Sequence, residues 1–362
     1  MKIIVISVLS GMLVVSSASA ASEGISFEGG LTLTAQFSDD NALKNGYFAS
    51  LDLVFGLPVG PGKFTAYIEG NTTPRENGVG TVLGEVNSDL GSALDASGNG
   101  RLQVSEFHYA LPAGPGTLTV GLLDASAFID GSEIANDETT QFLAGPFVNN
   151  PTIAFPDYSL GIAYQIEPQH NWPGINFVIT SSHGLADNEH ANYTQLFDIA
   201  DDEKGVFAAA EAVWPADNNI FRAGVWTNTG DNVLLDGSGR TEENYGIYVS
   251  NDHTFSFGKI NLRAGIANKL VSPAASFIAL SYETEIAGYT VGTAISQANV
   301  SEKAGPGTGD TRIFELYGRY DLNKQLQITP SIQWIENSNF DSTQTAYDDQ
   351  ITIFSLRMNY AF

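Results

Sequence analysis

The sequence of 362 residues contains no cysteine. This absence excludes disulfide bonds, thiol catalysis and zinc held by cysteine. Positive charge is also scarce, because 16 Lys and Arg stand against 41 Asp and Glu, giving a formal net charge of −25. A chain this acidic has little with which to neutralise a row of phosphates, so we expect it not to bind nucleic acid.

Long hydrophobic runs are missing after residue 20. No later stretch reaches the roughly eighteen apolar residues of a membrane-spanning helix. The chain begins with a positive charge at Lys2, an apolar run over residues 3–15, and the small residues Ala18-Ser19-Ala20. That order is typical of a secretory signal peptide, and we expect residues 1–20 to be cleaved. A retained N-terminal anchor is the alternative, but the run is short for one.

What fills the remaining sequence is a series of short stretches in which apolar and polar residues alternate. The clearest covers residues 325–334, where one face would carry Leu326, Ile328, Pro330, Ile332 and Trp334. A period of two residues is typical of a strand with two unlike faces. No stretch shows an apolar stripe at helical spacing over three turns. The sequence therefore predicts an all-β protein.

About sixteen such stretches are present, each near the nine to eleven residues that a tilted membrane strand needs. We predict strands near residues 25–37, 47–56, 62–70, 101–111, 115–123, 159–167, 174–183, 205–214, 219–228, 243–253, 257–267, 275–284, 288–298, 311–321, 325–336 and 351–362.

The connections between the predicted strands alternate in length. The long ones include 71–100, 123–158, 184–204, 229–242, 299–310 and 337–350, and the short ones include 57–61, 112–114, 215–218, 286–287 and 323–324. An up-and-down barrel with both ends in the periplasm predicts tight turns on that side and long loops outside. A soluble β-sandwich gives no reason for this alternation. We therefore predict one transmembrane antiparallel β-barrel over residues 21–362, placed in the bacterial outer membrane with its apolar face toward lipid.

The last predicted strand carries a separate signal. One of its faces would hold Phe354, Leu356, Met358, Tyr360 and the terminal Phe362. Such a strand resembles the one by which the outer-membrane assembly machinery recognises its clients, and we expect Phe362 to serve in that contact. The alternative is an ordinary amphipathic strand.

No arrangement of residues predicts an enzyme or a cofactor site. The five histidines show no H-x-x-x-H or H-E-x-x-H spacing, and no nucleophile elbow or phosphate-binding loop occurs in a strand–helix context. His183 and His190 lie in or beside a predicted outer loop, where a solvated loop is favoured over a metal site. A barrel lipase or protease would need a Ser–His pair at the surface, and no pairing stands out.

The segment 123–158 is too long and too mixed to be an idle loop. Its apolar residues would contribute nothing to stability if they were exposed to water, so we predict that it folds into the lumen and narrows the channel. A cap over the barrel mouth and a contact with a neighbouring subunit are the alternatives.

This segment also carries a family pattern, made up of Gly121, Asp124, Phe128, Asp130, Ala135 to Glu138, Gln141-Phe142 and Asn149-Asn150-Pro151, followed by the strand Leu160 to Tyr164. It resembles the carbohydrate-selective porin family of bacterial outer membranes (the OprB type). The resemblance implies a sixteen-stranded barrel that passes sugars and other small neutral solutes.

From the same residues we predict a constriction and solute-binding site. Phe128 and Phe142 would offer ring faces to a sugar, and the polar groups would come from Asp124, Asp130, Glu133, Asn136, Asp137, Glu138 and Gln141. Because an arginine that faces lipid is costly, we place four on the lumen wall, Arg222, Arg263, Arg319 and Arg357. Loop carboxylates facing these arginines would create a transverse field at the narrowest point. The alternative is that the arginines pair with Asp321, Glu315 or other wall carboxylates and brace the barrel.

The leading hypothesis from the sequence is a porin for passive diffusion of small hydrophilic solutes, with sugars as the expected permeants. A general or cation-preferring porin is a second hypothesis, since the acidic chain would concentrate cations at the mouth. A non-conducting adhesive or structural barrel is a third. A homo-oligomer is compatible with each, although no lipid-facing stripe of small residues marks a contact.

Overall fold

The computed structural model describes residues 24–169, 172–188, 190–197 and 205–362. The predicted signal peptide at residues 1–20 lies outside the described residues, as does part of the predicted connection 184–204. Within the described residues no helix has the length and apolarity that a membrane span needs.

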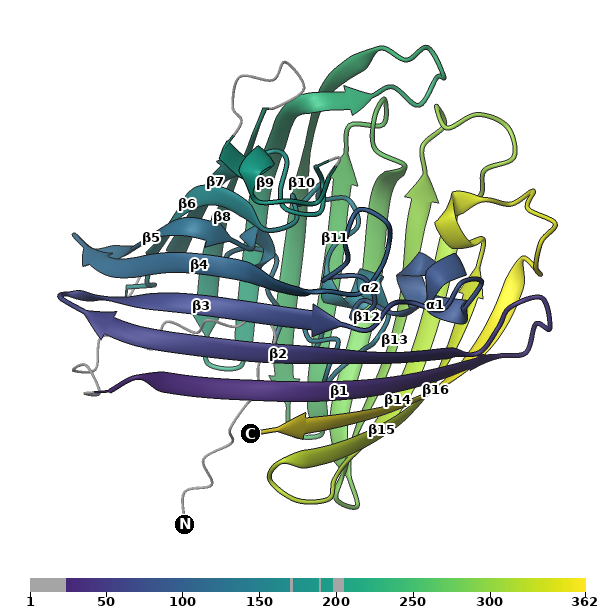
Figure 1. Cartoon of the computed structure of the whole chain (residues 1–362), viewed down its shortest axis with the longest axis horizontal. Coiled ribbons are helices and arrows are strands. Elements are labelled where there is room, and N and C mark those ends of the chain that lie inside the picture. The colour runs from purple at the N-terminus through teal and green to yellow at the C-terminus, as the bar shows by residue number, and fades with distance from the viewer. Residues whose placement is uncertain (1–23, 170–171, 189, 198–204) are drawn as a thin grey trace.

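The described residues form a closed barrel of sixteen antiparallel strands (Figure 1). Each strand pairs with its neighbours in sequence, and β1 pairs with β16 to close the ring. The strands are β1 (Ser26–Ser38), β2 (Gly46–Val59), β3 (Gly62–Asn71), β4 (Leu102–Ala113), β5 (Gly116–Leu123), β6 (Ser159–Ile166), β7 (Gly174–Ser181), β8 (Val206–Ala216), β9 (Asn219–Val233), β10 (Thr241–Phe255), β11 (Gly258–Ala267), β12 (Ala274–Ile286), β13 (Tyr289–Val300), β14 (Thr311–Asp321), β15 (Leu326–Glu336) and β16 (Gln350–Ala361). The predicted all-β, up-and-down barrel is confirmed, and each predicted strand coincides with an observed one.

The alternation of connection lengths is also confirmed. Two-residue turns such as 60–61, 114–115 and 217–218 lie at one end of the barrel, and the long loops lie at the other. One predicted boundary is wrong. The predicted loop 229–242 is mostly strand, because Thr241 pairs with Val233 and the β9–β10 ribbon continues with a register shift between Glu242 and Asn244. Only residues 234–240 link the two strands.

The outer face of the barrel is apolar along the strands. On β16 the side chain of Phe354 is 53% exposed, whereas its neighbour Ile353, which points inward, is 0% exposed. Aromatic rings gather at the end with the short turns, where Trp214 packs on Phe221 and Tyr289 packs on Tyr320. An apolar band with an aromatic girdle is the surface of a transmembrane β-barrel.

A glycine lies at the seam between β1 and β16. Gly29 and Phe362 exchange two backbone hydrogen bonds of 2.9 Å each. A Cβ atom on Gly29 would lie 2.5 Å from Cε2 of the Phe362 ring, so a side chain at this position would displace that ring. The ring also lies 6.1 Å from the Phe27 ring, measured between centroids.

The interior of the barrel is largely filled by two loops. Residues 124–158, which we call the strap, contain η2 (Ala125–Ala127) and α2 (Gly145–Val148). Residues 72–101, which we call the inner loop, contain α1 (Val79–Val82) and η1 (Gly84–Val86). The predicted inward fold of the strap is confirmed, whereas the inward fold of the inner loop was not predicted. Two further short helices, η3 (Thr194–Phe197) and η4 (Ser338–Phe340), lie in other loops.

The inner loop is held inside the barrel by side chains from the wall. The backbone carbonyl of Val86 accepts hydrogen bonds from Nε2 of Gln36 on β1, at 3.3 Å, and of Gln333 on β15, at 3.1 Å. Ser50 Oγ on β2 donates to a carboxylate oxygen of Asp89 at 2.7 Å. The inner loop also contacts the strap, since the backbone N–H of Ser88 donates to the Leu143 carbonyl at 2.9 Å.

Candidate pore and its constriction

One side of the strap is apolar and packs on the inner wall of the barrel. Near its start, Phe128 and Ile129 share a cluster with inward residues of β6–β10 that include Phe207 and Trp226. Further along, Phe142 and Phe147 share a second cluster with the inner loop and with inward residues of β12–β16, namely Ala274, Phe277, Ala279, Ala294, Ala298, Ile313, Tyr317, Ile335, Ile351 and Ile353. The strap and the wall therefore form a hydrophobic core that fills this part of the lumen.

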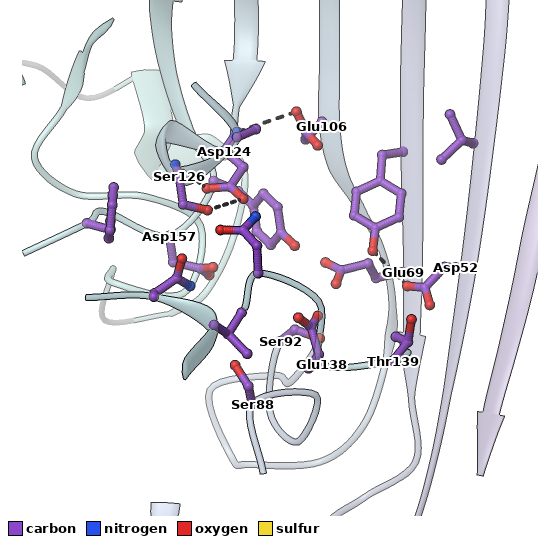
Figure 2. Close-up of a pocket in the computed structure, with 18 of the residues that line it drawn as sticks. Asp52, Glu69, Ser88, Ser92, Glu106, Asp124, Ser126, Glu138, Thr139 and Asp157 are labelled. Carbon is purple, nitrogen blue, oxygen red and sulfur yellow. Dashed lines mark hydrogen bonds between the residues drawn. The ribbon is translucent and has the colours of Figure 1, made fainter. Parts of the chain in front are cut away.

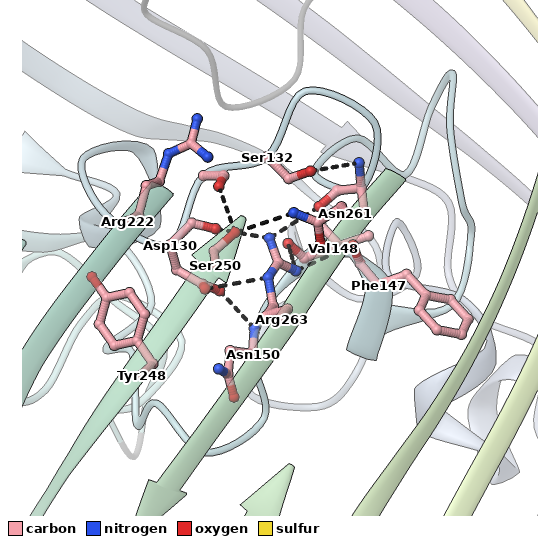
Figure 3. A network of polar contacts seen from close by, with 12 residues as sticks. Asp130, Ser132, Phe147, Val148, Asn150, Arg222, Tyr248, Ser250, Asn261 and Arg263 are labelled. Atoms are coloured by element: carbon pink, nitrogen blue, oxygen red, sulfur yellow. Dashed lines mark hydrogen bonds and ion pairs between the residues drawn. The ribbon is translucent and has the colours of Figure 1, made fainter. Parts of the chain in front are cut away.

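Arg263 on β11 holds the strap from the wall (Figure 3). Its Nη2 donates to the carbonyls of Asp130 at 2.8 Å and Ala135 at 3.0 Å. Its Nη1 donates to the carbonyls of Phe147 at 3.3 Å and Val148 at 3.2 Å. Its Nε lies 3.2 Å from Oδ1 of Asp130.

Arg222 on β9 acts through a second wall residue. Its Nη1 lies 2.6 Å from Oδ2 of Asp252 on β10. The other oxygen of that carboxylate accepts hydrogen bonds from Ser132 Oγ in the strap, at 2.8 Å, and from Asn261 Nδ2 on β11, at 2.9 Å. Arg222 therefore braces a wall carboxylate that binds the strap.

Arg319 on β14 and Arg357 on β16 bind the middle of the strap. Arg319 Nη1 donates to the Thr140 carbonyl at 2.7 Å. Arg357 Nη2 donates to the Gln141 carbonyl at 2.6 Å, and its Nη1 donates to the Glu138 carbonyl.

The wall also supplies acceptors to the strap backbone. The two carboxylate oxygens of Glu315 on β14 accept the N–H groups of Leu143 and Ala144, each at 2.9 Å. Glu211 on β8 accepts the N–H of Asp130 at 2.8 Å. Backbone groups that would be costly to leave unpaired inside the barrel are thus satisfied by wall side chains.

The four arginines point into the barrel, but two expectations about them and the strap are wrong. The arginines contact strap carbonyls or a wall carboxylate directly, so they and the strap do not face each other across an open gap with a transverse field. The rings of Phe128 and Phe142 are 6% and 0% exposed, so they offer no face to a solute. Both are buried because apolar rings stabilise the strap most when they pack on the wall.

An open cavity of about 560 Å³ lies on the opposite side of the strap, against β1–β4 (Figure 2). Seven carboxylates line it, Glu28, Asp52, Glu69, Glu106, Asp124, Glu138 and Asp157. Among the described residues that line it, Lys63 is the only one with a positive charge. The lining of the cavity is therefore rich in acidic groups.

Tyrosine rings and hydroxyl groups accompany these carboxylates. Tyr67 Oη donates to Oδ1 of Asp52 at 2.7 Å, and Ser105 Oγ donates to Glu69. The rings of Tyr67 and Tyr158 lie 6.5 Å apart between centroids, and both residues line the cavity.

Carboxyl groups of the strap in this cavity bind protons more tightly than usual. Burial raises the pKa of Asp157 to about 8, and the negative charge of Asp187 adds to the rise. Burial also raises the pKa of Glu138 well above its ordinary value, and the nearby Asp137 contributes. Burial raises the pKa of Asp124, although hydrogen bonds from Ser126 oppose that rise.

The predicted strap residues separate into two groups. Asp124, Asn136 and Glu138 line the cavity. The others serve the strap itself, since Asp130 pairs with Arg263, Glu133 pairs with Lys259 at 3.1 Å, Asp137 accepts the N–H groups of Thr139 and Thr140, and Gln141 bonds the backbone of Glu133 and Asn136.

The wall carboxylates of the cavity were not predicted as site residues. Asp52, Glu69 and Glu106 lie on β2, β3 and β4, within stretches that were predicted as strands. A carboxylate that faces lipid is costly, as an arginine is, so their position on predicted membrane strands would have placed these side chains in the lumen.

The fold is that of a sixteen-stranded transmembrane β-barrel whose lumen is partly filled by an inward-folded loop. No protein-family model matches the chain. An uncharacterized protein of Aquifex aeolicus is 24% identical over 306 residues, which cover 81% of this chain and 85% of that protein. Neither finding bears on the function.

Two solved structures superpose on this chain and show what its fold resembles. OprB of Pseudomonas putida superposes with a TM-score of 0.72 and 11% identity over 94% of both chains. A mutant of Rhodopseudomonas blastica porin superposes with a TM-score of 0.56 and 14% identity over 94% of this chain and 100% of that one. The resemblance to porins of the OprB type is therefore confirmed in the fold.

Proposed function

We propose that the protein is a passive diffusion channel for small hydrophilic solutes in a bacterial outer membrane, with sugars as the expected permeants. The observation that carries the proposal is the polar cavity that stays open beside the strap within a closed transmembrane barrel. The porin fold supports it as well. A channel of this kind needs no catalytic group and no cofactor.

The lining of the cavity suits a sugar chemically. Carboxylate oxygens accept hydrogen bonds from sugar hydroxyl groups, and those of Asp52 and Glu69 line the cavity. The ring of Tyr67 lies beside these acceptors and offers apolar surface against which the C–H groups of a sugar ring can pack. These groups lie on the β1–β4 side, not at the phenylalanines that the sequence suggested.

The direct test is osmotic swelling of liposomes that contain the purified protein, with protein-free liposomes as the control. We expect monosaccharides and disaccharides to enter faster than anionic solutes of the same size. If no solute enters in the presence of correctly folded protein, the proposal of a channel is refuted. If sugars and anions of matched size enter equally fast, a general porin replaces a sugar-permeable one.

A second candidate function is a cation-preferring channel, and the carboxylates of the cavity favour it. The lining of the cavity contains seven acidic residues and one lysine. The arginines inside the barrel are bound to the strap and to Asp252. We expect the reversal potential of a planar bilayer under a potassium chloride gradient to have the sign of a cation current. The opposite sign would refute this candidate and leave the channel itself intact.

A further inference from the structure

Arg263 is buried although it points into the lumen of a barrel. Only 1% of its surface is exposed, and Asp130, which pairs with it, is equally buried. An arginine in a water-filled channel would normally keep its charge hydrated. Here the strap covers it completely, so Arg263 belongs to the packing of the strap and does not face permeating solutes.

The guanidinium group of Arg263 joins two separate parts of the strap. Two of its four carbonyl partners, Asp130 and Ala135, lie near the start of the strap, and the other two, Phe147 and Val148, lie within α2. Arginine suits this position because its planar group presents several N–H donors in a fixed geometry. Without it, four buried carbonyls would lose a donor, and the carboxylate of Asp130 would lose its cation.

A glycine two residues further along β11 allows the strap to lie this close. A Cβ atom on Gly265 would be 2.2 Å from Thr152 Oγ1 and 2.8 Å from Asn150 Nδ2, both in the strap. The side chains of Asn150 and Thr152 are themselves joined by a hydrogen bond of 2.7 Å, so they present a firm surface to the wall. Strand β11 therefore both binds the strap and leaves space for it.

We propose that Arg263 is a positioning residue that sets the bore of the channel. By fixing the strap to β11 it closes the lumen on the β6–β16 side and confines conduction to the cavity beside β1–β4. This inference rests on the proposed function as a channel. Arg319 and Arg357 contribute less, because each binds only the middle of the strap, at residues 138–141.

The test compares variants of β11 with matched controls elsewhere in the barrel. Arg263→Gln removes the charge and most donors, Arg263→Lys keeps the charge, and Gly265→Val pushes on the strap without touching Arg263. Gly318→Val is the control for the added side chain, because nothing lies within 4 Å of a Cβ at that position. Arg312→Gln is the control for the lost charge, since its Nη1 pairs with Glu336 at 2.7 Å and 47% of its side chain is exposed.

The readouts are single-channel conductance and the largest sugar that swells liposomes, both measured on protein shown to be folded. We expect Arg263→Gln and Gly265→Val to raise the conductance about twofold and to admit larger sugars, because an unfastened strap reopens part of a wide barrel. Arg263→Lys should fall between parent and Arg263→Gln, and both controls should match the parent. Folded Arg263→Gln with the conductance and size limit of the parent would overturn the inference.

A tether covers the case in which Arg263→Gln does not fold. Ser250 Oγ on β10 lies 3.4 Å from the Gly131 carbonyl in the strap, and the chain has no cysteine of its own. The double variant Gly131→Cys, Ser250→Cys should conduct equally when oxidised and when reduced, because the strap is already fixed there. A drop in conductance on oxidation would mean that the strap must move during conduction, which contradicts the inference. A parent protein that does not conduct would refute the proposed function instead.

Discussion

The two inner walls of this barrel are unlike. The wall of β1–β4 carries carboxyl groups, a tyrosine and hydroxyl groups that line an open cavity. The wall of β12–β16 carries buried alanines and isoleucines, such as Ala279, Ala294 and Ile313, that face the strap and the inner loop. One half of the lumen thus behaves as a channel lining and the other half as a protein core.

This difference shows that an inward position in a barrel does not by itself mean contact with water. Small residues on the β12–β16 wall leave room for the rings of Phe142 and Phe147, so apolar surface is buried on both sides of the strap. The charges follow the same division. The arginines of the filled half bind the strap or a wall carboxylate, whereas the carboxyl groups of the open half line the cavity.

The largest expected effect comes from breaking the core of the filled half. The Phe142 ring is buried and lies 5.0 Å from the Tyr317 ring and 5.3 Å from the Phe147 ring, between centroids. Phe142→Ala should lower the free energy of unfolding by about 3–5 kcal/mol, because it leaves a cavity that the fixed wall cannot close. Urea unfolding in lipid vesicles measures this. Phe354→Ala removes the same ring from the lipid face and should cost clearly less, so equal losses would contradict the core assignment.

A smaller loss is expected where the open wall meets the end of the chain. Gly29→Val places side-chain atoms where the Phe362 ring lies, and we expect a destabilisation of about 1–3 kcal/mol from overpacking at the seam. The same unfolding experiment measures it, with Gly318→Val as the control. Gly29→Val with parental stability would show that the Phe362 ring moves away without cost.

Much of the fold was predictable because a membrane barrel leaves a strong pattern in sequence. Alternation along residues 325–334 and the regular change between short and long connections each follow from the geometry of lipid, wall and lumen. The inward fold of the strap was predictable from its apolar residues. The extension of β9 and β10 beyond residue 228 was not, because polar pairs such as Glu242 with Asn232 form a ribbon without an apolar face.

The division of the lumen was much harder to predict. Val79, Leu83 and Val86 of the inner loop are buried in the same core as the strap, but they lie in a segment rich in Gly, Asn and Asp that resembles a solvated loop. The partners of the arginines were also out of reach. Arg263 binds backbone carbonyls, and a carbonyl group has no signature in sequence because every residue has one. Only the three-dimensional path of the strap brings them to β11.

Two glutamates distinguish the two walls. Glu28 on β1 is exposed and lines the cavity, whereas Glu315 on β14 is buried beneath the strap and accepts two of its N–H groups. Glu28→Gln should lower the ratio of cation to anion permeability about twofold, because it removes one exposed acidic group from the lining of the cavity. Glu315→Gln should lower stability and leave the permeability ratio nearly unchanged. Reversal potentials under a salt gradient measure the ratio, and equal shifts for both variants would refute the division of the lumen.

The smallest expected effect is the dependence of this ratio on pH. The pKa of Asp157 is raised to about 8 by burial and by the negative charges of Asp187, Glu69 and Asp124. Its carboxyl group is therefore mostly protonated near pH 7 and becomes charged as the pH rises through about 8. We expect cation preference to increase by less than about twofold between about pH 6 and about pH 9. Reversal potentials recorded across this range test the effect, and Asp157→Asn should remove the upper part of the rise. A variant that keeps the full increase would show that other carboxyl groups of the open wall titrate there instead.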